Sequence, residues 1–258
     1  MKAINAWGRL SHDMHEVQVL SDPTQVANVL TSHKPGLAYG NGRSYGDVCL
    51  NPKGQLWQTS GLNKLMSFDE NTGRLVCEAG VWLRDIQRLM VPRGWMLPVT
   101  PGTQLITVGG AIANDVHGKN HHVVGSFGDH VVGLTLARTS GEVLQLDWSN
   151  TPALMSATVG GLGLTGVVVT VELQMRRVGS PWLQTETLPY QGLDEFFELA
   201  DSSEQGWEHT VSWIDCLSRS SLRGIFIRGK HLSQEQVKSR PSLHAAGVSL
   251  QRKADNKP

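Results

Sequence analysis

The order of apolar and polar residues predicts short helices and strands that alternate along the first part of the chain. A helix begins at Asp22-Pro23, where a capping carboxylate precedes a proline at the first helical position, and its apolar face follows over 26–30. A short apolar strand is predicted over 37–39. Residues 81–91 have helical spacing of their apolar positions, and Gly94 lies just beyond as a stop signal.

Two β-hairpins and a longer strand complete this pattern. Leu65–Glu78 is typical of a hairpin with a five-residue turn over Asp69–Gly73. Leu134–Leu146 has the same pattern around a turn at 139–142, and residues 167–175 are rich in β-branched side chains. Short strands, hairpins and interspersed helices together predict the α+β class.

The sequence changes in character near residue 178. Two prolines, an amphipathic segment over 193–199 and strand-like segments over 210–214 and 224–227 follow. We therefore expect a first domain over 1–178, the start of a second over 179–230, and a polar basic tail over 231–258. Residues 228–258 hold seven Lys or Arg against two acidic residues, a balance of 7 − 2 = +5, which favours a solvated tail.

Composition excludes several classes of protein. The 258 residues are 40% hydrophobic and 18% charged, with 23 Lys+Arg against 23 Asp+Glu, so disorder is excluded and general nucleic-acid binding is not expected. Cys49, Cys77 and Cys216 are few, odd in number and far apart, which fits a reducing compartment. The longest apolar stretch, Thr158–Val171, is short and glycine-rich, and no signal peptide is visible, so we expect a cytoplasmic protein.

Three glycine-rich loops are the strongest chemical signal. They cover 40–46, 101–110 and 160–166. Glycines at this density let successive N–H groups converge on an anion, which suits the pyrophosphate of a dinucleotide. The first loop is not a Rossmann fingerprint, because Tyr45 stands where its third glycine is needed, and no P-loop motif exists. From the residues alone, a role in turns only stays open.

A histidine-rich segment follows the second loop. It runs Asn114-Asp115-Val116-His117-Gly118-Lys119-Asn120-His121-His122. His117 and His121 are four residues apart, but Gly118 disfavours a helix and no HExxH is present, so we predict no metal site. A polar, basic cluster beside an anion-binding loop favours substrate orientation and proton transfer. A metal-dependent hydrolase is the competing interpretation.

These segments together resemble a known family of flavoproteins. GNGRSYGD (40–47), PGT with TVGGAIANDVHGKNHHVVGSFGDHV (101–131) and ATVGGLGLTGV (157–167) are similar to the FAD domain of the vanillyl-alcohol-oxidase type. HGKNHH in register with GRSYGD is most similar to the decaprenylphosphoryl-β-D-ribose 2′-oxidase branch, and the resemblance covers about residues 9–227. It implies a two-subdomain α+β FAD-binding domain of the PCMH type, followed by an incomplete α+β substrate domain.

The resemblance also implies which residues hold the cofactor. Relatives with covalent flavin carry a histidine directly before the serine of the first loop, whereas Arg43 stands here, so FAD is expected to bind non-covalently. The residues expected to hold phosphate, ribose and flavin are Gly40, Asn41, Gly42, Arg43, Ser44, Tyr45, Gly46, Asp47, Gly102, Thr103, Thr107, Val108, Gly109, Gly110, Asn114, Val116, His117, Gly118 and Val167.

The chemistry implied by the resemblance is the oxidation of a secondary alcohol by hydride transfer to flavin N5. His117 would be the acid/base or orienting group, Lys119 would meet the sugar or its phosphate, and Tyr45 would border the pocket. The implied substrate is a sugar or a polyprenyl-phosphate sugar, with at most peripheral membrane contact. A reductase is one further partner that this chemistry allows.

Family members continue past the end of this chain, and their remainder completes the substrate domain. Two further interpretations therefore stay open. One is an FAD-binding but catalytically incomplete fragment that needs a complementing C-terminal chain. The other is an alditol or aldonolactone oxidase, which Arg43 disfavours because those relatives generally carry the covalent histidine.

Overall fold

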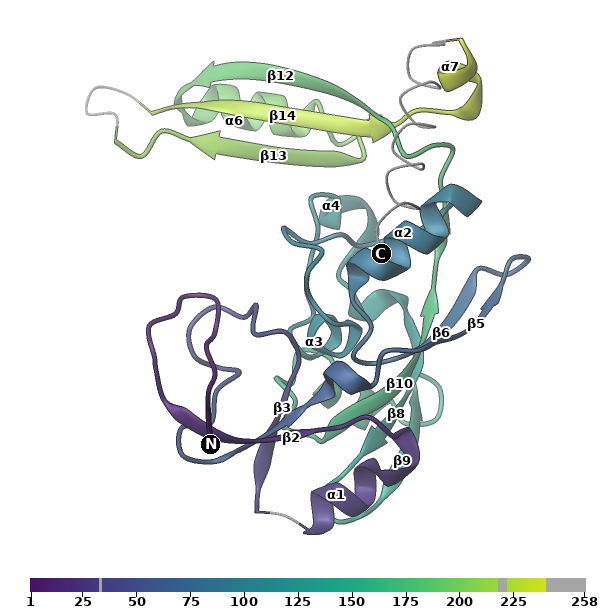
Figure 1. Ribbon diagram of the computed structural model, residues 1–258. Helices are drawn as coiled ribbons and strands as arrows, with labels where there is room; N and C mark the ends of the chain where they lie inside the picture. The colour runs from purple at the N-terminus through teal and green to yellow at the C-terminus, as the bar shows by residue number, and fades with distance from the viewer. Residues whose placement is uncertain (33, 218–221, 240–258) are drawn as a thin grey trace, which may run out of the picture. The chain divides into compact units, whose positions relative to one another are not determined.

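The computed structural model describes residues 1–32, 34–217 and 222–239, and these form two compact units (Figure 1). Unit 1 comprises Met1–Met90 and Met96–Arg176. Unit 2 comprises Val91–Trp95 and the chain from Arg177 onward. Of the polar tail expected over 231–258, residues 240–258 lie outside the described part of the chain.

Unit 1 is built on two sheets. The first has the order β1-β2-β4-β3, in which β2 and β3 run parallel to β4 and β1 is antiparallel to β2. The second is antiparallel throughout, with the order β5-β6-β10-β8-β9. The strands are β1 (Lys2–Ala3), β2 (Met14–Val19), β3 (Gly36–Tyr39), β4 (Gln55–Gln58), β5 (Leu65–Asp69), β6 (Arg74–Glu78), β8 (Val131–Ala137), β9 (Val143–Asp147) and β10 (Val167–Gln174). Two further short strands, β7 (Trp95–Met96) and β11 (Arg176–Arg177), pair with each other.

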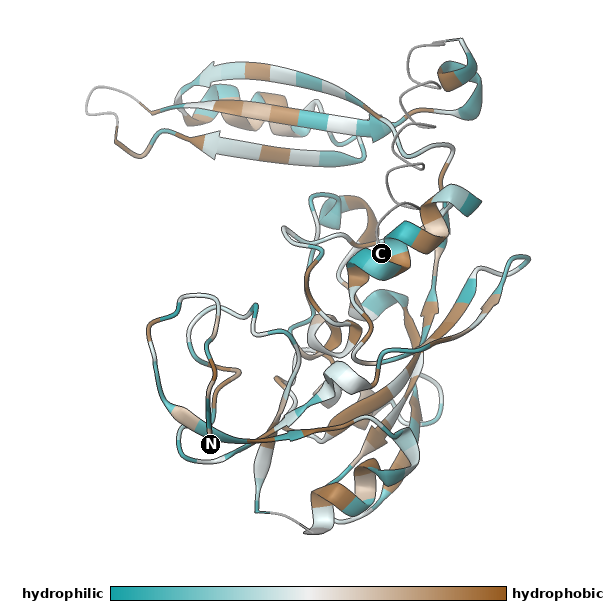
Figure 2. Ribbon diagram, in the orientation of Figure 1, coloured by the Kyte–Doolittle hydropathy of each residue, from teal (hydrophilic) through white to brown (hydrophobic). Residues whose placement is uncertain are grey.

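Helices accompany these sheets, and the first, third and fifth of them contact strands of the second sheet. They are α1 (Val26–Ser32), α2 (Leu83–Met90), α3 (Val108–Ala113), α4 (His121–Val124) and α5 (Pro152–Thr158). Figure 2 shows hydrophobic residues gathered on α1 and β10. One core cluster joins α1 to the sheets through Leu30, Trp57, Ala137 and Val169, all nearly fully buried. This burial fixes β3, which leads into the first glycine-rich loop, and the start of β10, which follows the third.

Unit 2 contains a three-stranded antiparallel sheet of order β12-β14-β13. Its elements are β12 (Leu183–Gln191), α6 (Gly192–Asp201), β13 (His209–Ile214), β14 (Arg223–His231) and α7 (Gln234–Lys238). Tyr190, Phe196 and Phe226 join α6 to the sheet, with ring centroids 5.6 and 6.0 Å apart. Of the helices in the described part of the chain, none is long and apolar enough to cross a bilayer.

The α+β class is confirmed, and so are both predicted hairpins. The cap at the first helix is also confirmed, since Asp22 Oδ1 accepts a hydrogen bond from Thr24 N at 2.9 Å. The second glycine loop was predicted wrongly in part, because residues 108–113 form α3. Thr107 caps this helix, which outweighs the low helix propensity of Gly109 and Gly110.

Candidate functional site

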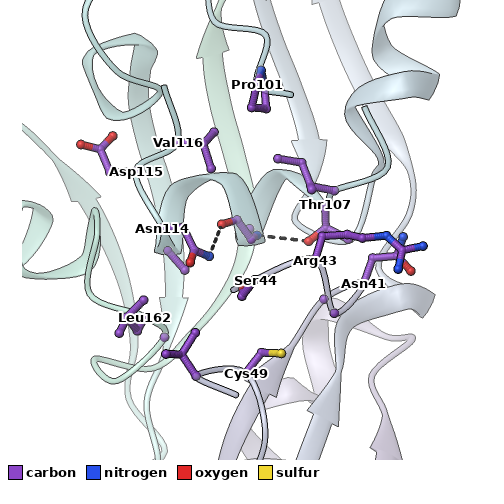
Figure 3. A pocket seen from close by; sticks show the side chains of 18 of the residues that line it. Asn41, Arg43, Ser44, Cys49, Pro101, Thr107, Asn114, Asp115, Val116 and Leu162 are labelled. Atoms are coloured by element: carbon purple, nitrogen blue, oxygen red, sulfur yellow. Dashed lines mark hydrogen bonds between the residues drawn. The ribbon is translucent and has the colours of Figure 1, made fainter. Parts of the chain in front are cut away.

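A cavity of about 670 Å³ opens in unit 1, and all three glycine-rich loops contribute to its wall (Figure 3). Its size lies within the range of small-molecule and cofactor sites. The sequence-predicted residues that line it are Gly40, Asn41, Gly42, Arg43, Ser44, Tyr45, Gly102, Thr103, Thr107, Gly109, Gly110, Asn114, Val116, His117, Gly118 and Lys119. Segments far apart in the sequence are thus brought to one cavity.

The first loop leaves β3 and turns sharply at Gly42. This glycine has φ +61°, and a Cβ there would overlap the Tyr39 hydroxyl and lie 2.7 Å from the Asn5 carbonyl oxygen. Only glycine fits this backbone without displacing its neighbours. Among the described residues, the backbone N–H groups of 41–46 donate to no acceptor. A run of such donors on a cavity wall can bind an anion.

The start of α3 lies directly beside this loop. Thr107 Oγ1 accepts a hydrogen bond from Gly110 N at 3.1 Å, and Asn41 Nδ2 donates to Leu105 O at 2.7 Å. Figure 3 shows Asn41 and Arg43 beside Thr107, with Asn114 at the other end of the helix. These contacts tie the first loop to the segment that caps α3.

The N–H groups at the start of α3 have protein acceptors. Val108 N donates to Val81 O at 2.9 Å and Gly109 N donates to Ala79 O at 2.8 Å. They therefore do not form a nest for a diphosphate, and the first loop is the better candidate for that role. Gly109 serves close packing instead, because a Cβ there would lie 3.1 Å from the Ala79 methyl group.

A turn after α3 carries His117 and Lys119 to the cavity. Asp115 has φ +40°, and its carboxylate accepts from Ser126 Oγ and Gly128 N, both at 2.9 Å. His117 forms an isolated bridge with Ser126. The carboxylate thus pins the returning 126–128 segment against the turn and fixes the backbone on which His117 stands.

Asn120 stabilises the same turn from the protein interior. Its side chain is fully buried, and Nδ2 donates to Pro98 O at 2.8 Å. The rings of His117 and His121 meet edge to face with centroids 5.5 Å apart, and His121 Nδ1 lies 3.2 Å from Gly118 O. Lys119 and His117 therefore lie on a segment that these contacts hold in place.

Tyr39 and Cys49 line the inner part of the cavity. Burial is the main cause that raises the pKa of each group. Both side chains are consequently neutral near pH 7, and the cavity holds no charge from them. Tyr45, by contrast, stands at the rim with 82% of its surface exposed.

Four of the residues predicted from sequence lie outside this cavity wall. Val108 and Val167 are fully buried in the core, while Gly46 and Asp47 follow the part of the first loop that faces the cavity. Near Val167, the neighbouring Gly166 and Val168 line the cavity instead. Because side chains alternate along a strand, the face that Val167 presents could not be read from the sequence alone.

Sequence reasoning missed other lining residues. They are Trp7, Ala38, Tyr39, Val48, Cys49, Thr59, Pro101, Ile106, Ala113, Asp115, Leu162, Gly163, Gly166 and Val168. The third glycine loop was a signal for Leu162, Gly163 and Gly166. No sequence signal pointed to Trp7, because it lies far from every motif in the sequence and only the folding of the chain brings it to the cavity.

Comparison with known proteins adds a family match. The model of the FAD binding domain family matches residues 19–147. The decaprenylphosphoryl-beta-D-ribose oxidase of Mycolicibacterium smegmatis is 35% identical over 252 residues, which cover 93% of this chain and 54% of that protein. The L-gulonolactone oxidase of Mus musculus is 29% identical over 137 residues, which cover 52% of this chain and 30% of that protein.

A D-lactate dehydrogenase of Anaerostipes hadrus is 25% identical over 140 residues, covering 52% of this chain and 29% of that protein. The chain therefore spans about half the length of the first of these relatives and less of the other two.

Proposed function

Because the chain belongs to the FAD binding domain family, whose cofactor is FAD, we propose that it is an FAD-dependent oxidoreductase that oxidises a secondary alcohol of a sugar. The observation that carries this proposal is the cavity in which the three glycine-rich loops meet the segment of His117 and Lys119. The cofactor site and a side chain that can transfer a proton, His117, then line the same cavity.

The residues of the cavity fit a dinucleotide. The N–H groups of 41–46 suit a pyrophosphate, and Arg43 adds a cation to the same wall. A Cβ added at Gly102, which lines the cavity, would meet no atom within 4 Å, so the backbone there is open to a close ligand. We further propose that FAD is bound non-covalently, since Arg43 takes the place of the histidine that carries the flavin in covalent relatives.

FAD supplies the acceptor of a hydride when it is bound. His117 is the residue of this chain that takes the hydroxyl proton or orients the hydroxyl group, because an imidazole nitrogen can accept a proton or a hydrogen bond. Lys119, two residues further on, offers a cation to a phosphate or to sugar hydroxyls. Tyr45, at the rim, borders the path of the substrate.

We propose a polyprenyl-phosphate sugar as the substrate class. The Mycolicibacterium smegmatis relative is named for decaprenylphosphoryl-β-D-ribose, and Lys119 is suited to a phosphate on such a molecule. To reach a lipid-linked substrate, the protein would bind peripherally to a membrane surface. A reductase, or another electron acceptor, would then return the cofactor to its oxidised state.

An FAD-binding module that needs a complementing C-terminal chain is the second candidate. It is favoured by one observation, namely that the chain spans only 54% of the Mycolicibacterium smegmatis oxidase. Oxidation of an aldonolactone is a weaker candidate. The gulonolactone oxidase matches a shorter part of this chain at lower identity.

Anaerobic flavin reduction tests the proposal. We expect the purified chain to be yellow, to release its flavin on acid precipitation, and to lose its visible flavin absorbance when a short-chain polyprenylphosphoryl-ribose is added. His117→Ala should slow this reduction by about 10²- to 10⁴-fold while the bound flavin stays. His122→Ala, which removes a neighbouring imidazole that does not line the cavity, is the matched control.

The outcomes separate the candidates. A yellow chain that is reduced only after addition of the C-terminal part of the relative supports the incomplete module. Reduction by L-gulonolactone but not by the ribose lipid supports the aldonolactone oxidase. Unchanged reduction in His117→Ala contradicts the role proposed for His117.

A further inference from the structure

Unit 2 contains a cluster of metal-ligating side chains that no sequence motif indicates. His209 is the first residue of β13, Glu208 directly precedes it, and His231 is the last residue of β14. In the antiparallel register His209 is opposite Gly229. His231 lies two residues beyond Gly229, so both imidazoles project from the same face of the sheet.

The three side chains converge closely. One ligand atom of each lies within 4.8 Å of the corresponding atoms of the other two. His209 Nε2 is 3.1 Å from Glu208 Oε1, and the two imidazole rings are 5.8 Å apart between centroids. The side chains of Glu208 and His209 are only 17% and 15% exposed, so the cluster is largely shielded from water.

A backbone carbonyl orients His231. Its Nδ1 is 2.9 Å from Ser180 O, and since a carbonyl oxygen only accepts, Nδ1 carries a hydrogen, which leaves the lone pair of the neutral ring on Nε2. Ser180 is itself fixed, because its Oγ donates to Leu232 O at 2.8 Å. A metal-ligating histidine typically donates its other ring nitrogen to such a carbonyl, which fixes the tautomer needed for ligation.

We propose that Glu208, His209 and His231 bind one zinc-type divalent transition-metal ion. Two imidazoles and a carboxylate are a ligand set that such ions prefer, and three protein ligands leave the fourth tetrahedral position to water. Ligation at about 2.0–2.2 Å would draw the three side chains slightly closer together. The ion would tie the start of β13 to the end of β14.

The competing explanation is a simple ion pair between His209 and Glu208. An ion pair needs neither His231 nor its hydrogen bond to Ser180 O. The two explanations therefore differ in whether His231 is required, and in whether a metal is bound at all.

Calorimetric titration of the chelator-treated full chain with Zn²⁺ tests the proposal. We expect one saturable binding event that weakens by at least about tenfold in His231→Ala and in His209→Ala. The control is His122→Ala, which removes an exposed imidazole from the other histidine-rich segment and should leave the event intact. Co²⁺ in place of Zn²⁺ should give the visible absorption bands of a tetrahedral site, lost in the same two variants.

Two results would overturn the proposal. One is the absence of a saturable event in the wild-type chain. The other is an event that His122→Ala removes while His231→Ala retains it. If either alanine variant fails to fold, Glu208→Gln keeps the shape of the side chain and removes one ligand charge, and binding that is unchanged in this variant contradicts the site.

Discussion

Gly42 shows how one residue sets the course of the first loop. Its φ of +61° and the overlap of a Cβ with the Tyr39 hydroxyl make Gly42→Ala costly in two ways. We expect the free energy of unfolding to fall by about 3 kcal/mol, from left-handed strain and overpacking together. Denaturant unfolding measures this.

Gly46→Ala is the matched control for that prediction. Gly46 has nearly the same φ, +58°, but nothing lies within 4 Å of a Cβ built there. Only the backbone strain remains, so we expect a loss of about 1 kcal/mol. Equal losses in the two variants would show that the contact with Tyr39 contributes nothing.

The three cysteines report on burial and on the cavity. Burial raises the pKa of Cys77 to about 12, so about one thiol in 10⁴ is ionised at pH 8. We expect Cys77 to react with a maleimide only after unfolding. Cys49, whose pKa burial also raises, should react slowly, and exposed Cys216 should react fast.

Added FAD should slow the labelling of Cys49 further, because this thiol lines the cavity. Cys216 lies in unit 2 and is the internal control, with an unchanged rate expected. Peptide mapping after timed labelling gives all three rates from one sample. A Cys49 rate that is insensitive to saturating FAD would contradict the placement of the cofactor in this cavity.

At the scale of elements, Thr107 decides where α3 begins. Its Oγ1 satisfies the N–H of Gly110, which would otherwise lack a partner at the first turn. Thr107→Ala should therefore lower the free energy of unfolding by about 1 kcal/mol, and Thr107→Ser, which keeps the hydroxyl, by much less. Chemical denaturation of both variants is the test, and equal losses would mean that the lost methyl group, not the cap, matters.

The same helix shows what the sequence could and could not predict. Local signals such as the cap at Asp22 and the turn at Asp69–Gly73 act within a few residues, and these elements were predicted correctly. The helix at 108–113 was missed because its two glycines oppose helix formation, and the Thr107 cap together with contacts of its N–H groups with Ala79 and Val81 overrides that preference.

Strands whose pairing partners lie far away in the sequence were harder to predict than this helix. β4 is central in its sheet, between β2 and β3, and its residues are mostly buried, so it lacks the alternation by which a strand is predicted. β12 contains Pro189, a residue that disfavours central strands, but β12 is an edge strand where proline is tolerated. The position of β12 in the sheet, and not its own residues, explains why a segment with a proline forms a strand.

At the scale of the whole molecule, the candidate sites belong to different units. The cavity of the three glycine loops lies in unit 1, and the sequence indicated these loops because each of them carries its own motif, whereas lining residues outside the motifs were missed. The cluster of Glu208, His209 and His231 lies in unit 2 and was not predictable. Its members meet only through the register of β13 and β14, which no short pattern in the sequence encodes.

Hydrogen exchange with each ligand should separate these two sites in a single experiment. A ligand at 100 times its Kd stabilises the folded form by about 2.7 kcal/mol, and exchange slows at amides whose opening releases that ligand. We expect FAD to slow exchange in peptides that cover 38–49, 101–119 and 160–168, which line the cavity. Zn²⁺ should instead slow exchange around 208–210 and 229–231, where the ends of β13 and β14 carry its ligands.

Protection of the strand ends by FAD without protection of the cavity peptides would contradict the cofactor site. If Zn²⁺ slows exchange only at residues 117–124, the metal binds to that histidine-rich segment and not to the strand ends. Within the described chain, that segment is the competing source of imidazoles.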